Sequence, residues 1–230
     1  MQRRSRPILM YAIIAAALPV ALLTLTSHAQ ATPPSHARLH TGSPVRSATA
    51  PLDTATFAGG CFWSMERPFD HVPGVVATAV GYAGGHTKNP TYEEVSTRTT
   101  GHAESVQVVY DPAQVTYDKL LDVYWHNIDP VTKEAQFCDG GNDYRTIVFY
   151  HNDAQRQAAE RSRKVVQHHF KQPLATEVIP ASTFWMAEEY HQHFADRNPV
   201  RYNAYRIGCR RGERLTELWG ASAAPFVPTH

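Results

Sequence analysis

Hydrophobic and polar positions follow two periods along the middle of the chain, one typical of strands and the other of helices. Within residues 102–112, Val106, Val108 and Tyr110 occupy every second position, so we expect them to share one face of a strand. In residues 116–130 the apolar positions instead recur at helical spacing. Strands are predicted over residues 54–60, 74–85, 102–112, 144–151 and 174–182, and helices over residues 61–71, 116–130, 152–170 and 187–197.

The order of these elements, β-α-β-β-α-β-α-β-α, predicts an α/β (α+β) fold. Helices that connect strands in this way pack on a mixed sheet, as a two-layer sandwich with a ferredoxin-like split β-α-β core. The pattern covers residues 52–220, which we expect to form one domain. It is absent from residues 32–51, predicted to be a flexible linker, and from residues 221–230, predicted to be a disordered tail.

The first 31 residues have the pattern of a secretory signal peptide. Three arginines precede an apolar stretch, residues 8–25, and the small-residue site Ala29-Gln30-Ala31 follows it. The chain is therefore predicted to be exported, with the periplasm as its compartment. The alternative is that residues 8–25, which nearly match the length of a bilayer-spanning helix, remain as a membrane anchor.

Charge and composition limit the classes of function. The chain has 230 residues, and its 22 Lys and Arg are matched by 21 Asp and Glu, so it lacks the basic excess typical of nucleic-acid binding. Hydrophobic residues make up 43% of the chain, as in a globular enzyme. We expect a monomer that binds no nucleic acid.

Cys61 is the first candidate for chemistry, because an odd thiol in an exported protein with three cysteines requires an explanation. It follows Gly59 and Gly60 at the start of a predicted helix, where the helix dipole and unpaired N–H groups favour a thiolate. We therefore predict a lowered pKa and a nucleophilic role, with the glycines letting the backbone come close to whatever approaches the sulfur. The alternative is a buried structural cysteine. Phe62 and Trp63 point about 100° apart on a helix, so one of them can line a pocket.

Four polar residues are candidates for assisting such a nucleophile. Glu104 follows a glycine-rich connection and can act as a general acid if burial raises its pKa; otherwise it is an exposed loop residue. Tyr92 and Tyr144 lie on or beside long polar connections and offer O–H donors, which Asp139 can orient.

The 13 histidines invite a search for a metal site. The pairs closest to ligand spacing are His168-His169 and His191-x-His193. No cysteine pair and no i,i+4 histidine pair supports them, so we expect neither a metal nor a bound cofactor.

Six stretches, in this order and spacing, resemble the motifs of the A-type peptide methionine sulfoxide reductases. They are "GGCFWSMERPF", "PGVVATAVGYAGG", "NPTYEEV", "TGHAESVQVVYDP", "DYRTIVFY" and "AEEYHQHF". Together they span almost all of residues 54–219, and an ordered set of six is far more specific than any one of them.

The resemblance implies a role for each polar candidate. Cys61 would be the nucleophile that attacks the sulfoxide sulfur and becomes a sulfenic acid, while Glu104 donates a proton to the departing oxygen. Tyr92 and Tyr144 would hydrogen-bond that oxygen, and Asp139 would order this polar wall.

The resemblance also implies the substrate. Phe62 and Trp63 would seat the ε-methyl group of methionine sulfoxide, and A-type enzymes take the S form. The expected substrates are oxidised proteins and free methionine sulfoxide. Two other readings stay open, a thiol peroxidase and a module that binds methionine sulfoxide without reducing it.

The resolving cysteine is less defined, because Ser96 stands where many relatives have a cysteine. One remaining cysteine must attack the sulfenic acid to form a disulfide. We favour Cys209, because we expect the C-terminal segment to be mobile enough to reach the site. Cys138, which precedes Asp139, is the alternative, and a Cys138–Cys209 relay is a third. An external dithiol, thioredoxin or a thioredoxin-like domain, would then reduce the enzyme.

Overall fold

The structure is a computed structural model, and it describes residues 51–220. The predicted signal peptide (residues 1–31) and tail (residues 221–230) lie outside the described residues, as does the linker (residues 32–51) except for Pro51. Export and the membrane-anchor alternative therefore stay predictions. Within residues 51–220, no helix combines the length and the apolar character that a bilayer-spanning segment needs.

A six-stranded mixed sheet forms the centre of the domain, with the order β7-β6-β1-β3-β2-β8. Its members are β1 (Asp53–Gly59), β2 (Val75–Ala83), β3 (Ala103–Tyr110), β6 (Thr146–Tyr150), β7 (Glu177–Pro180) and β8 (Trp185–Met186). Strands β6 and β7 are parallel, and the other neighbours are antiparallel. A separate small hairpin pairs β4 (Ala135–Gln136) with β5 (Asp139–Gly140). All five predicted strands are present, and the mixed sheet confirms the predicted fold class.

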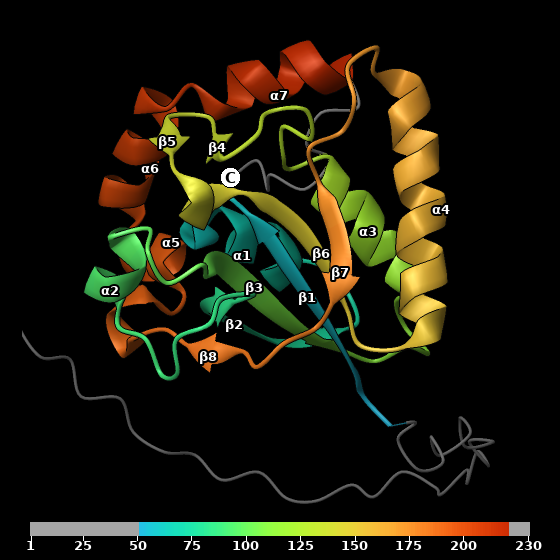
Figure 1. Cartoon of the computed structure of the whole chain (residues 1–230), viewed down its shortest axis with the longest axis horizontal. Helices are drawn as coiled ribbons and strands as arrows, with labels where there is room; N and C mark the ends of the chain where they lie inside the picture. The colour runs from blue at the N-terminus through green and yellow to red at the C-terminus, as the bar shows by residue number, and fades with distance from the viewer. Residues whose placement is uncertain (1–50, 221–230) are drawn as a thin grey trace, which may run out of the picture. The chain divides into compact units, whose positions relative to one another are not determined.

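Apolar side chains alternate along the strands and give the sheet one strongly apolar face, which helices cover. The side chains of Val106, Val108 and Tyr110 on β3 share a buried cluster with Phe57 of β1, as the period of two predicts. The predicted helices that contribute to this cluster are α1 (Phe62–Asp70), α3 (Tyr117–Trp125) and α4 (Asp153–His169). Figure 1 shows α3 and α4 side by side near β6 and β7. These helices confirm three of the four predicted ones.

The prediction of a helix over residues 187–197 is wrong. The segment instead contains a 3₁₀ turn, η2 (Glu189–His191), and a one-turn helix, α5 (Phe194–Arg197). Gln192 explains the difference, because its side chain accepts a hydrogen bond from the N–H of Val80 (2.9 Å) and donates one to the C=O of Val80 (3.0 Å). Side-chain pairing with strand β2 thus replaces a continuous helix.

Two further helices, α6 (Pro199–Gly208) and α7 (Arg211–Trp219), follow where the sequence analysis predicts none. Proline is favoured at the first position of α6, because its missing N–H would have no partner there. Helix α7 buries Leu215 and Trp219, four residues apart, in the main core. Cys209 therefore lies between two helices and not in an irregular tail.

Candidate active site

Cys61 lies at the junction of β1 and α1, at the N-cap position of the helix. Its C=O accepts hydrogen bonds from the N–H groups of Ser64 and Met65 (3.0 and 3.3 Å), which start the helix. Its side chain makes no capping bond and is a free thiol. Only 8% of the residue is exposed, so water has little access to the sulfur.

The two glycines before Cys61 serve the packing of the chain itself. Gly60 has a φ of +85°, and a Cβ there would lie 2.5 Å from Cβ of Gln136. A Cβ on Gly59 would lie 2.7 Å from Cγ2 of Ile128. The glycine pair therefore lets Gln136 and Ile128 pack against this turn, which differs from the predicted role of admitting a ligand to the sulfur.

The electrostatic environment of Cys61 keeps its proton on the sulfur. Burial raises the pKa of the Cys61 thiol far above its usual range, and the charge of Glu104 acts in the same direction. Hydrogen bonds with the Tyr205 side chain and the Trp63 backbone favour the thiolate but do not outweigh burial. The predicted lowering of this pKa is wrong, because a helix dipole contributes about 2 kcal/mol at most whereas desolvating an ion costs several.

Glu104 reaches the same helix start from β3. Its Oε2 accepts a hydrogen bond from the backbone N–H of Phe62 (2.9 Å), and only 3% of the residue is exposed. Burial raises the pKa of Glu104 to about 8, partly offset by the Phe62 bond, and the charges of Asp139 and Asp143 raise it further. The carboxyl is therefore protonated at neutral pH, as a general acid requires. In that form it carries no charge that would oppose a thiolate at Cys61.

Two tyrosines come from the polar connections and lie within electrostatic range of Glu104. Tyr92 is the first residue of α2 (Tyr92–Ser96), and Tyr144 is the last of a 3₁₀ turn, η1 (Asn142–Tyr144). Burial raises the pKa of both hydroxyls, and the charge of Glu104 raises both further. Both side chains therefore remain O–H donors at neutral pH.

The two aromatics after Cys61 share a neighbour. Trp63 stacks on Phe194 with 3.7 Å between ring centroids and donates its indole N–H to Nδ1 of His191 (3.1 Å). The buried ring of Phe62 lies 4.9 Å from that of His191. Nε2 of His191 is buried without a hydrogen-bond partner among the described residues. From its spacing in the sequence, His191 is only a metal candidate, whereas in the structure it contacts both aromatics.

A disulfide between Cys138 and Cys209 lies next to this group, with 5.0 Å between the Cα atoms. Asp139 follows Cys138, and its Oδ2 accepts a hydrogen bond from the Tyr205 hydroxyl. The Tyr205 hydroxyl also acts on the Cys61 side chain, because it lowers the pKa of the thiol against the larger effect of burial. Tyr205 is not among the residues predicted from the sequence. Its position four residues before Cys209, on one face of a helix, is the signal that could have identified it.

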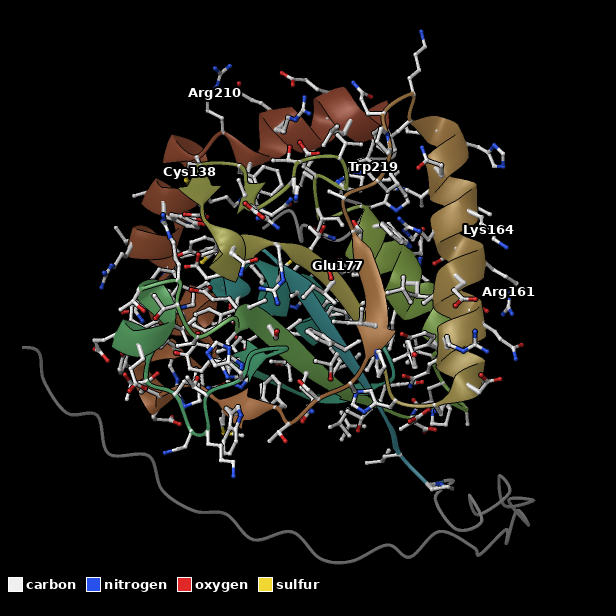
Figure 2. The ribbon with its side chains drawn as sticks, viewed as in Figure 1. Cys138, Arg161, Lys164, Glu177, Arg210 and Trp219 are labelled. Atoms are coloured by element: carbon white, nitrogen blue, oxygen red, sulfur yellow. A yellow bond between two sulfur atoms is a disulfide. The ribbon has the colours of Figure 1, made fainter. Side chains whose placement is uncertain are left out.

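The disulfide lies where α6 meets α7. Figure 2 shows Cys138 near Arg210 at this junction, and Trp219 at the far end of α7. Burial raises the pKa of the Asp139 carboxyl, while the Tyr205 hydrogen bond and the charge of Arg211, which is only 4% exposed, lower it. The junction thus places one buried cation beside the polar residues of the site.

Glu66 and Asp70 of α1 could hold a cation together with His193, because their ligand atoms lie within 4.8 Å of one another. Burial and the charge of Asp70 raise the pKa of Glu66 to about 7. The Thr78 hydroxyl and the backbone N–H of His193 already donate to these carboxylates. This arrangement therefore satisfies the oxygens with internal hydrogen bonds, and the expectation that no metal is needed stays a prediction.

Comparison with known sequences identifies a matching family model and similar proteins. The family model described as "Peptide methionine sulfoxide reductase" matches residues 53–223. "Peptide methionine sulfoxide reductase MsrA" of Bacillus licheniformis is 52% identical over 170 residues, which is 73% of this chain and 94% of that protein. The protein of the same name from Bacillus subtilis is 48% identical over 171 residues, 74% of this chain and 97% of its own length.

Solved structures with the same fold have related names. "Methionine sulfoxide reductase A of Corynebacterium diphtheriae" gives a TM-score of 0.61 at 38% identity and covers 65% of this chain and 76% of its own. Mxr1 from Saccharomyces cerevisiae in reduced form gives 0.63 at 32% identity, with 66% and 90% covered. The likeness in sequence extends over the domain that carries Cys61, Glu104 and the disulfide.

Proposed function

The chain belongs to the peptide methionine sulfoxide reductase family and reduces methionine sulfoxide by thiol chemistry, and from that membership we propose that Cys61 attacks the sulfoxide sulfur while Glu104 protonates the oxygen. The oxygen is transferred to Cys61, which is oxidised by two electrons to a sulfenic acid, and methionine is released. The substrates are protein-bound and free methionine S-sulfoxide, and the biological role is the repair of oxidised proteins.

The observation that carries this proposal is the pairing of a buried thiol with a protonated carboxyl at one helix start. Glu104 is held by the N–H of Phe62, the residue directly after Cys61. Its pKa of about 8 supplies a proton at neutral pH, in a place from which water is largely excluded. A departing sulfoxide oxygen needs such a proton, because it gains negative charge as the S–O bond weakens.

Selection of the S form follows from fixing the sulfoxide sulfur at three points. Phe62 and Trp63 seat the methyl group, and Trp63 is held for this by His191 and Phe194. The hydroxyls of Tyr92 and Tyr144 hold the oxygen. The peptide chain leaves in the third direction, so the opposite epimer would place its oxygen against the aromatic rings and leave the donors unpaired.

A peptide with a separated pair of methionine sulfoxide epimers tests this function. We expect the S epimer to be reduced at least about 100-fold faster than the R epimer, since the wrong epimer loses hydrogen bonds that a built site provides. Chromatography of the methionine product, with dithiothreitol as reductant, measures both rates. Equal rates would contradict the proposed seat, and binding of the S epimer without product would support a non-catalytic module.

The Cys138–Cys209 disulfide supports a relay as the second half of the cycle. Cys209 caps α6 one turn after Tyr205, whose hydroxyl lowers the pKa of the Cys61 thiol, so we propose that Cys209 attacks the sulfenic acid first. The thiolate of Cys138 then displaces Cys61 and leaves the Cys138–Cys209 disulfide. Cys138 is exposed, and a thioredoxin-like dithiol reopens the bond from outside.

Single-cysteine variants separate the two orders of attack. After one turnover without reductant, Cys138→Ser is expected to accumulate a Cys61–Cys209 disulfide, whereas Cys209→Ser keeps the sulfenic acid, because its first attacker is missing. Mass spectrometry of digests, with a dione reagent that labels sulfenic acids, distinguishes the two products. The reverse pattern would make Cys138 the resolving residue.

A further inference from the structure

Residues 188–192, the segment that replaces the predicted helix, are anchored to two elements that border the site. The Gln192 side chain pairs with the backbone of β2 through two hydrogen bonds (2.9 and 3.0 Å). The Glu188 carboxylate accepts a hydrogen bond from the backbone N–H of Tyr92, the first residue of α2 (2.9 Å). His191 lies between these two anchors, and its own N–H donates to the C=O of Glu188 (2.9 Å). The place of His191 relative to the site is therefore fixed from both sides.

The ring of His191 contacts both parts of the proposed substrate pocket. Its centroid lies 4.9 Å from that of Phe62 and 5.7 Å from that of Trp63, the two residues of the proposed methyl seat. On another side it lies 4.6 Å from the ring of Tyr92, one of the proposed oxygen donors. Only 2% of His191 is exposed. One buried side chain thus joins the methyl seat to an oxygen donor.

The hydrogen bond between Trp63 and His191 fixes the orientation of the indole ring. Trp63 stacks on Phe194 with 3.7 Å between centroids and an angle of 9° between planes. Two parallel rings can turn against each other in their common plane and keep most of their contact. The indole N–H, which donates to Nδ1 of His191 at 3.1 Å, allows only one such orientation. The edge that Trp63 presents to a methyl group therefore depends on His191.

The hydrogen bonding of His191 explains why a histidine occupies this position. An indole N–H can only donate, so Nδ1 must be the unprotonated nitrogen, and the proton of the neutral ring is on Nε2. Nε2 is buried and has no hydrogen-bond partner within residues 51–220. An unpaired buried N–H costs at least as much stability as one neutral hydrogen bond contributes. A phenylalanine would fill the same space without that cost, so the acceptor for Trp63, and not packing, favours histidine.

We propose that His191 is a positioning residue that holds the methyl seat in a fixed place relative to the Tyr92 hydroxyl, and that this placement determines the preference for one sulfoxide epimer. The inference rests on the function proposed above. The two epimers carry the same methyl group, oxygen and chain, in opposite order around the sulfur. A site distinguishes them only if its methyl seat and its oxygen donors keep their relative positions.

Two substitutions of His191 remove different parts of this connection. His191→Phe keeps a ring beside Phe62 and Tyr92 but offers no acceptor to Trp63. The methyl group does not change during the reaction, so a looser seat weakens the binding of substrate and transition state alike. We expect the half-saturating peptide concentration to rise about tenfold at a nearly unchanged maximal rate, and the ratio of S to R rates to fall about tenfold.

His191→Asn removes the ring and keeps an acceptor. Its amide oxygen lies near the place of Nδ1 and can bind the indole N–H, but no ring then supports Tyr92. The Tyr92 hydroxyl holds the oxygen on which charge develops, so its displacement affects the transition state more than the bound substrate. We expect the maximal rate to fall about tenfold at a nearly unchanged half-saturating concentration.

The test uses the disulfide form of the full chain, whose one free thiol can release one methionine per chain. Single-turnover rates are measured against the concentration of a short peptide that carries either the S or the R sulfoxide, without reductant. The matched control is His169→Phe, the same substitution at a histidine that stacks on Trp219 (5.3 Å) in the main core. It should keep the wild-type rates, half-saturating concentrations and epimer ratio.

The epimer ratio separates a positioning role from a purely structural one. An unchanged ratio in His191→Phe would overturn the proposal even if both rates fell, because a packing defect slows both epimers equally. Trp63→Phe lacks the indole N–H, so adding His191→Phe to it should cause no further fall in the ratio, and additive falls would also overturn the proposal. If His191→Phe does not fold, His191→Asn decides by its predicted loss of maximal rate alone. A wild type that forms no methionine from the S epimer would instead refute the proposed function.

Discussion

Replacing Cys61 by serine is expected to abolish methionine formation, with a loss of more than about 1,000-fold in kcat/KM. The reaction requires a side chain that is oxidised by two electrons as it takes the oxygen, and a serine hydroxyl cannot be. Serine resembles cysteine in size, so the packing around Gln136 and Ile128 should survive. Release of methionine from an S-sulfoxide peptide with excess dithiothreitol measures the effect, and the thermal unfolding transition checks the fold.

The chain offers two matched controls for this experiment. Cys138→Ser and Cys209→Ser each remove one sulfur and the disulfide, yet both keep Cys61 and Glu104. Each should release methionine in a first turnover at a rate within a few-fold of that of wild type. Turnover by Cys61→Ser at a comparable rate would show that another group is the nucleophile.

Burial and reactivity at Cys61 are compatible if the thiolate forms only during the reaction. The folded site holds two protons, one on the thiol and one on Glu104. A neutral, largely covered thiol reacts slowly with oxidants in general, because the thiolate is the reactive form. A sulfoxide that enters with its oxygen toward Glu104 and the tyrosines presents its sulfur to Cys61. Formation of the bond to that sulfur then offsets the cost of ionising the thiol.

The sequence predicts the elements whose pattern is local. Val106, Val108 and Tyr110 alternate, and their strand packs with that side against α1 and α3. Glu104 follows the same alternation, which places it on the helix-covered side with Val106, and this accounts for its burial. The alternation of residues along this strand therefore predicts the burial of Glu104, and that burial raises its pKa.

Other features depend on contacts between distant segments and have no local signal. The break at Gln192 is caused by the backbone of β2, more than a hundred residues earlier. The pKa of Cys61 depends on how much water the fold excludes, which overrides the helix dipole that the sequence does indicate. Tyr205 gains its position from a disulfide and from Asp139, and neither link follows from its neighbours in the chain.

Glu104→Gln is expected to lower the rate of the first turnover by about 100- to 10,000-fold, the range that general acids contribute. Glutamine keeps the size of the side chain and an oxygen for the N–H of Phe62, but it has no acidic proton to give. Burial raises the pKa of Glu104 to about 8, so the acid form predominates below that pH and is lost above it. Wild-type rates should therefore fall as pH rises through about 8, whereas Glu104→Gln should show no fall with this midpoint.

The same ionisation provides an independent check through stability. Because the pKa of Glu104 is higher in the folded state than in the unfolded chain, its contribution to stability is complete below the unfolded value, about 4.3, and is lost as pH rises to about 8. Wild type should lose free energy of unfolding relative to Glu104→Gln across this interval, measured by denaturant titration at several pH values. A fall in rate near pH 8 that persists in Glu104→Gln would assign the acid role to another group, whatever the stability curves show.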